Sequence, residues 1–161
     1  LRAAEIAAAS RMPGSRLSLL LMGTNDLVKE TRAELDAQRT AALHWLATCL
    51  LAARAHGLDI IDGVYNNFRD LDGLEREARQ GRMLGFDGKS LIHPDQIAIA
   101  NATFGPAPDE VAEARRIIAA FEAPEAKGKG VIKLDGRMVE LLHAAMARRV
   151  VAIADAIGKR R

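Results

Sequence analysis

The sequence is poor in cysteine, in aromatic residues and in long apolar runs, and each shortage excludes a class of protein. Cys49 is the only cysteine among the 161 residues, which excludes an internal disulfide framework and fits a reducing, cytoplasmic setting. Aromatic residues make up 4% of the chain and alanine is frequent, so we expect a helix-rich, closely packed protein. The apolar run at residues 17–22 is much shorter than the about 20 residues that span a bilayer, so we expect no membrane partner.

The sequence also has little excess of one charge over the other. Lys and Arg number 23 and Asp and Glu number 21, so no basic surface points to a nucleic-acid partner. The sequence contains no Gly-x-Gly-x-x-Gly dinucleotide motif and no zinc-type spacing of Cys and His. What remains is 49% hydrophobic and 27% charged residues, the composition of a globular domain with a substantial core.

Short apolar segments alternate with longer helical ones over the first two thirds of the chain. Strands are predicted at residues 17–22, 58–62 and 88–92, and the continuous apolar character of the first predicts burial on both faces. A long amphipathic stretch ends at Gly57, and a helix capped by Asp70 or Asp72 is expected to run to about Met83. Strand–helix alternation of this kind indicates βαβ units and a parallel sheet.

The pattern changes after residue 105. Helices are predicted at about 108–121 and 138–157, joined by an extended piece at 131–134 and a turn at 135–136. We therefore expect an α/β region over residues 1–105 and a helical extension over 106–161. Residues 1–10 read as the end of a helix already under way, so we expect the chain to begin inside a domain.

Polar residues follow each predicted strand, where the active sites of parallel α/β proteins gather. Asp26 either binds a hard cation such as Mg²⁺ or caps the next element. Asp62 is expected to bond loop amides, and Lys89 either meets an anionic substrate or forms a surface salt bridge. His93 precedes a proline at a strand end, where we expect an architectural hydrogen bond, and Cys49 is expected to pack in the core.

Several of these residues fall in blocks that strongly resemble one family. The chain is similar to the citrate lyase β-subunit/malyl-CoA lyase family, the CoA-thioester branch of the HpcH/HpaI aldolases. The blocks that carry the resemblance are residues 23–27 (GTNDL), 61–65 (IDGVY), 85–97 (GFDGKSLIHPDQI), 104–106 (FGP), 110–116 (EVAEARR) and 134–138 (LDGRM). The third block is the most specific, and the resemblance covers nearly the whole chain.

The resemblance implies a fold and a metal. Family members are (β/α)₈ barrels of the TIM type with a C-terminal helical extension, so the predicted strands would be the last three of the barrel. A complete barrel needs about 250 residues. The family depends on Mg²⁺, held by a Glu after the fifth strand and by an Asp that Asp26 matches. That Glu is expected upstream of residue 1, and we therefore expect the 161-residue chain alone to be inactive.

The resemblance also implies a reaction and a proton donor. A carbon–carbon lyase of this family cleaves a hydroxyacyl-CoA thioester such as malyl-CoA to acetyl-CoA and glyoxylate, and a carboxylate on the C-terminal extension protonates the enolate. Glu140 stands at that position where relatives usually have Asp, and Leu142 replaces the usual Pro. Two alternatives are a malyl-CoA-type thioesterase and a catalytically silent structural subunit. A homo-oligomer, trimer or hexamer, is expected, with the extension reaching a neighbouring protomer.

Overall fold

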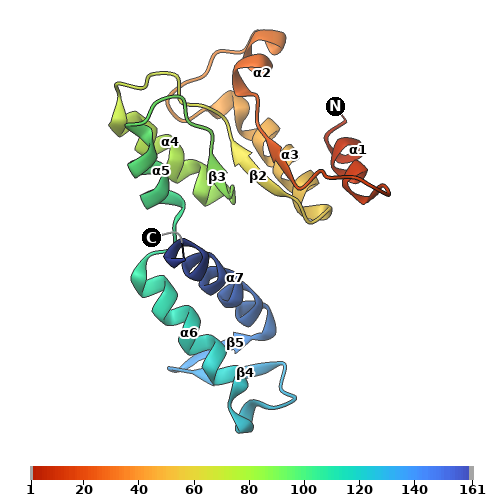
Figure 1. The fold of residues 1–161 in the computed structure, drawn as a ribbon, viewed down its shortest axis with the longest axis vertical. Helices are drawn as coiled ribbons and strands as arrows, with labels where there is room; N and C mark the ends of the chain where they lie inside the picture. The colour runs from red at the N-terminus through yellow and green to blue at the C-terminus, as the bar shows by residue number, and fades with distance from the viewer. Residues whose placement is uncertain (1, 160–161) are drawn as a thin grey trace. The chain divides into compact units, whose positions relative to one another are not determined.

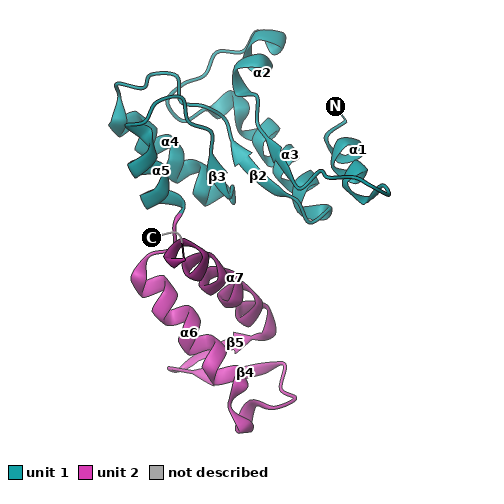
Figure 2. Ribbon diagram, viewed as in Figure 1, with its two compact units in different colours: residues 1–104 teal, residues 105–161 magenta. Residues whose placement is uncertain are grey.

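The chain divides into two compact units, residues 1–104 and 105–161 (Figure 2). The computed structural model describes residues 2–159. The first unit is an α/β arrangement around a parallel sheet, and the second combines helices with a β-hairpin (Figure 1). None of the helices in the described residues is both long and apolar enough to cross a membrane.

The sheet of the first unit is parallel, as the strand–helix alternation predicts. Its strands are β1 (Leu19–Leu21), β2 (Asp59–Asp62) and β3 (Gly88–Lys89), which lie in that order. Leu19 pairs with Asp59, and Ile61 pairs with Gly88. All the carboxyl ends therefore lie at one edge of the sheet. The strands are shorter than the predicted 17–22 and 88–92 because the ladder ends where the chain turns into loops.

Helices precede, connect and follow these strands. They are α1 (Ala3–Ala8), α2 (Thr24–Thr31), α3 (Leu43–Ala55), α4 (Leu71–Leu84) and α5 (Gln96–Phe104), with 3₁₀ turns at Ala9–Arg11 and Thr40–Ala42. The long amphipathic stretch is interrupted, because Arg32 adopts a left-handed conformation (φ 58°) that ends α2. Gly57 follows α3 with φ 70°, as its predicted place beyond a helix end requires.

The core of the first unit lies where α3 packs against the sheet. Leu46, Ala53 and Ile60 are fully buried there, and Cys49 packs against this cluster as predicted. Burial raises the pKa of the Cys49 thiol, which keeps it neutral and unreactive. The prediction that residues 17–22 are buried on both faces is wrong for the described chain. Leu19 and Leu21 are 43% and 56% exposed, because their face of β1 has no covering layer among residues 2–104.

Asp70 caps α4, one of the two positions that the sequence offers. The backbone N–H of Gly73 and the hydroxyl of Tyr65 donate to its carboxylate at 2.8 and 2.7 Å. These two hydrogen bonds lower the pKa of Asp70 below its ordinary value. The cap therefore stabilises the folded state fully above the ordinary pKa of about 3.9. This stabilisation is lost as the pH falls through the lower native pKa.

We expect Asp70→Ala to lower the melting temperature near neutral pH and to lower it progressively less in acid. Thermal denaturation of both proteins across the acid range measures this convergence. Asp72→Ala removes an exposed acid from the first turn of the same helix and should cause a smaller change in the melting temperature. If the difference in melting temperature between Asp70→Ala and the parent protein does not become smaller in acid, the stabilisation does not depend on ionised Asp70.

The second unit pairs two helices with an antiparallel hairpin. Its elements are α6 (Pro108–Glu122), a 3₁₀ turn at Pro124–Ala126, β4 (Val131–Leu134), β5 (Arg137–Glu140) and α7 (Leu141–Gly158). Asp135 and Gly136 form the turn, both with positive φ, as predicted. The predicted helix from residue 138 is wrong at its start. Residues 138–140 complete β5, which places Glu140 at the junction between β5 and α7.

Candidate functional site

The carboxyl ends of β1 and β2 bring the predicted polar loops side by side. Asp26 lies in the first turn of α2, directly after β1, and its carboxylate is exposed. Among residues 2–159 it has no hydrogen-bond or ion-pair partner, so it does not serve as the alternative helix cap. Gly23 occupies the N-cap position. An exposed, unpaired carboxylate at this edge is a suitable oxygen ligand for a hard cation.

Asp26 would supply one ligand of such a site. Within the described part of the chain, no three side chains of His, Cys, Asp or Glu gather closely enough to hold a metal ion. Mg²⁺ in enzymes commonly takes only one or two carboxylates and keeps several waters or substrate oxygens. The donor chemistry of Asp26 therefore fits Mg²⁺, and its assignment as a ligand stays a prediction.

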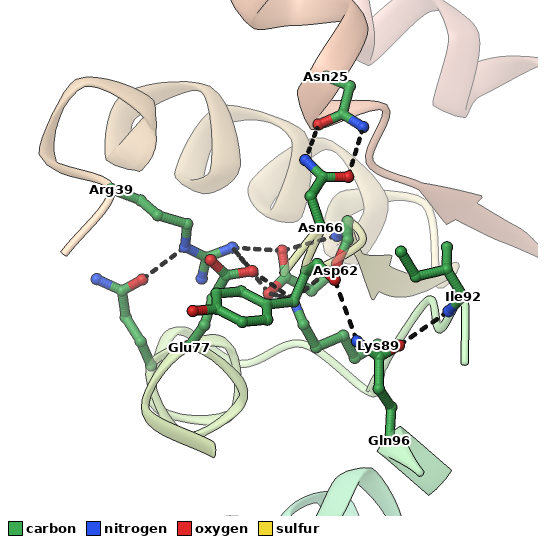
Figure 3. A network of polar contacts seen from close by, with 11 residues as sticks. Asn25, Arg39, Asp62, Asn66, Glu77, Lys89, Ile92 and Gln96 are labelled. Carbon is green, nitrogen blue, oxygen red and sulfur yellow. Dashed lines mark hydrogen bonds and ion pairs between the residues drawn. The ribbon is translucent and has the colours of Figure 1, made fainter. Parts of the chain in front are cut away.

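Asparagine side chains join the two loops next to Asp26. Asn25 and Asn66 exchange hydrogen bonds through their side-chain amides, at 3.1 Å in one direction and 2.8 Å in the other (Figure 3). Both also line a cavity of about 300 Å³ that extends toward the start of α4. Other residues lining this cavity include Thr24, Arg39, Tyr65, Arg76 and Glu77.

Below this edge lies a buried group of charges, which we call the charge cluster: Arg39, Asp62, Glu77 and Lys89 (Figure 3). Arg39 donates to both carboxylate oxygens of Asp62 at 2.8 and 2.9 Å. Lys89 Nζ lies 3.3 Å from Asp62 and 2.6 Å from Glu77. Asp62 is fully buried and Arg39 is 3% exposed. The formal charges sum to zero, which is how such a group is tolerated out of water.

The charge cluster corrects one prediction and supports another. Lys89 forms neither a surface salt bridge nor a contact surface for an anion, because its ammonium is enclosed by Asp62, Glu77 and the carbonyl of Gly63. Asp62 accepts from the Gly63 N–H at 2.8 Å, as expected for an aspartate at a strand end. Arg39 carried no sequence signal, since it follows an irregular loop in a left-handed conformation (φ 53°).

Gln96 lies in the block at residues 85–97, but the sequence patterns assigned it no role. It is fully buried, and its side-chain oxygen accepts the backbone N–H groups of Ile92 and His93 at 2.9 and 3.3 Å. Its amide nitrogen donates to the carbonyl of Tyr65 at 3.1 Å. His93 stacks on Phe68 with ring centres 4.8 Å apart and accepts from the Asp95 N–H, which is the architectural role predicted for it.

Glu140 belongs to the second unit and is exposed at the start of α7. Its backbone N–H donates to Nδ1 of His143 at 2.9 Å. The hydrogen bond fixes the backbone of Glu140 where the hairpin passes into the helix. The role of Glu140 as a proton donor stays a prediction.

Comparison with known proteins places this architecture in a family. The profile of the HpcH/HpaI aldolase/citrate lyase family matches residues 1–94. The chain belongs to this family. As an HpcH/HpaI family member it is 55% identical over 157 residues to a (3S)-malyl-CoA thioesterase of Cereibacter sphaeroides (strain KD131 / KCTC 12085), an alignment that covers 98% of this chain and 53% of that protein.

Other HpcH/HpaI relatives are named as lyases or bind coenzyme A. An L-malyl-CoA/β-methylmalyl-CoA lyase of Cereibacter sphaeroides (strain ATCC 17025 / ATH 2.4.3) is 41% identical over 71% of this chain and 36% of its own length. The structure of protein CitE from Mycobacterium tuberculosis, in complex with magnesium, acetoacetate and coenzyme A, is 33% identical with a TM-score of 0.67. That match covers 93% of this chain and 56% of CitE. The chain thus spans about half the length of the thioesterase and of CitE.

Proposed function

We propose that this protein is a Mg²⁺-dependent enzyme that acts on a malyl-CoA-type thioester and hydrolyses it to the free acid and coenzyme A. The observation that carries the proposal is the 55% identity to a (3S)-malyl-CoA thioesterase across 98% of the chain. The 33% identical CitE structure, which holds magnesium and coenzyme A, supports the metal and the thioester class. Asp26 supports it from this chain's own geometry, as an unpaired carboxylate at the active edge of a parallel sheet.

We further propose that the first unit contributes the last strands of a (β/α)₈ barrel. The parallel order β1-β2-β3 and the polar loops gathered at its carboxyl edge support this assignment. In such a barrel the remaining strands would continue the sheet beside β1 and β3, and further metal ligands would come from their carboxyl ends. The second unit would be the extension that follows the barrel.

Different residues of the chain would then have different roles in this reaction. Bound Mg²⁺ supplies positive charge that polarises a substrate oxygen and stabilises negative charge developing on it. Asp26 holds the cation through a carboxylate that no other described group engages. Asn25 and Asn66 line the adjacent cavity and join the start of α2 to the loop after β2 through their paired amides. The charge cluster lies buried beneath and fixes the loops from which these side chains project.

Carbon–carbon cleavage is the second candidate, because the 41% identical relative is a malyl-CoA lyase. In that reaction malyl-CoA gives glyoxylate and the enolate of acetyl-CoA, which must gain a proton. We propose Glu140 as the donor of that proton, delivered into the site of a neighbouring protomer in a homo-oligomer. Glu140→Gln keeps the shape but removes the acid, so we expect glyoxylate formation to fall by about 10² to 10⁴. Glu125→Gln, another exposed acid of the second unit, is the matched control.

Product analysis decides between the two reactions. The natural full-length protein is incubated with malyl-CoA with and without Mg²⁺, while glyoxylate, malate and free coenzyme A thiol are measured. We expect malate and coenzyme A to appear in equal amounts, only with Mg²⁺, and without glyoxylate. Glyoxylate and acetyl-CoA in equal amounts would favour the lyase instead. Absence of both turnover and Mg²⁺ binding would favour a catalytically silent subunit and overturn the proposal.

A further inference from the structure

We propose that Asn66 is a positioning residue for the metal ligand Asp26, acting through its reciprocal amide pair with Asn25. The inference rests on the proposed role of Asp26. Asn25 directly precedes Asp26 in the first turn of α2, whereas Asn66 comes from the separate loop after β2 (Figure 3). The pair therefore joins the segment that carries the metal ligand to a second strand end.

The amide pair requires an amide at both positions. Each side chain donates one hydrogen bond and accepts one, at 3.1 and 2.8 Å. An alanine at either position removes both bonds, and an aspartate removes one donor and sets two acceptor oxygens against each other. Two bonds between planar groups also fix orientation, which a single bond does not. The backbone just before Asp26 is thereby held in one direction.

A close contact next to the pair keeps the loops in register. Thr24, which precedes Asn25, is 6% exposed and packs against Gly63. A Cβ placed on Gly63 would lie 2.3 Å from the hydroxyl oxygen of Thr24 and 3.0 Å from the carbonyl of Met22, so only glycine fits there. This contact sets the separation of the loops, and the amide pair sets the direction of the residue beside Asp26.

The loop that carries Asn66 is itself anchored from the far side. Lys89 donates to the carbonyl of Gly63 at 2.7 Å, and Gln96 donates to the carbonyl of Tyr65 at 3.1 Å. Both anchors belong to the block at residues 85–97, the most specific block of the sequence. Their side chains are buried, so water does not compete for these bonds. Asn66 thus extends from a rigid support, and the block acts on Asp26 through it.

The test measures Mg²⁺ binding to the natural full-length protein by calorimetry, without substrate. We expect Asn66→Ala to weaken Mg²⁺ binding about tenfold, within the range for residues that orient metal ligands. The melting temperature should not change beyond that of Asn67→Ala, the matched control on the same exposed loop. Asn25→Ala combined with Asn66→Ala should weaken binding no further than either single change, because one pair is lost in each case.

Three results would overturn the inference, and they are distinguishable. Mg²⁺ binding by Asn66→Ala that equals the parent, while Asp26→Ala binds none, would exclude the positioning role and leave the proposed metal ligand intact. Mg²⁺ binding by Asp26→Ala that equals the parent would exclude Asp26 as a ligand. That result would exclude both the positioning role of Asn66 and the proposed function with Asp26 as metal ligand. Losses in the two single variants that add in the double variant would also exclude action as a pair.

Discussion

Replacement of Asp26 by alanine is expected to lower Mg²⁺-dependent turnover of a malyl-CoA-type thioester by about a hundredfold or more. Residues that only orient metal ligands already contribute about 10- to 100-fold, and a direct ligand contributes at least as much. The carboxylate is exposed and makes no bond within the described chain, so its loss should leave folding intact. Steady-state kinetics over a range of Mg²⁺ concentrations, with the melting temperature alongside, measures both effects.

Glu30→Ala is the matched control for this experiment. Glu30 is an exposed acid one turn further along α2, where it pairs with Lys29. The Glu30→Ala substitution removes a negative charge from the same helix but leaves its first turn unchanged, so we expect nearly unchanged kinetics. Equal losses in both variants would mean that the charge of α2, not ligation by Asp26, supports the reaction. Partial recovery of Asp26→Ala at high Mg²⁺ would fit weakened binding of the cation.

Removal of the Asp62 carboxylate should be the most destabilising single change in the charge cluster. Asp62 is fully buried and neutralises Arg39 and Lys89 together, so Asp62→Ala leaves excess positive charge out of water. Breaking a buried ion pair by removal of one partner costs about 3–5 kcal/mol. That is a large part of the about 5–15 kcal/mol by which domains are stable. Equilibrium unfolding in urea measures the free energy of unfolding.

An exposed ion pair on α4 provides the comparison. Glu75 and Arg79 lie one turn apart on the surface, and such pairs contribute about 0.3–0.5 kcal/mol. Glu75→Ala should therefore leave the urea midpoint nearly unchanged. Asp62→Asn keeps the shape of the side chain and should be less destabilising than alanine, although it still lacks the negative charge. A free energy of unfolding for Asp62→Ala within 1 kcal/mol of the parent would contradict the role of the charge cluster.

Sequence periodicity anticipated the features that depend on local chemistry. The parallel sheet, a cap at Asp70 or Asp72 and the turn at residues 135–136 are predicted from local patterns, and the structure selects Asp70 as the cap. The partners of Lys89 could not be predicted in this way. They lie 27 residues away at Asp62 and 12 residues away at Glu77, and they meet only when α4 folds onto the sheet edge. The local sequence places Lys89 at a predicted strand, but it does not indicate whether the ammonium is buried or exposed.

The same limit explains the outcome at the candidate site. Asp26 is a candidate from the sequence because its carboxylate lies in the loop after a predicted strand, and its role as a ligand stays a prediction. Its relation to Asn66 depends on the register of β1 against β2, which no sequence period reports. The start of α7 was placed too early because residues 138–140 suit either a helix or a strand. Pairing of Met138 with Lys133 in the hairpin decides for the strand.

The neutrality of the charge cluster restricts how this sequence can change over time. Loss of Lys89 alone leaves an unpaired negative charge in the interior, and loss of Asp62 alone leaves an unpaired positive charge. Substitutions at these sites are therefore viable in compensating pairs, an acid exchanged together with a base. Loss of Lys89 is therefore expected to cost less stability when Asp62 at the end of β2 or Glu77 on α4 is neutralised with it.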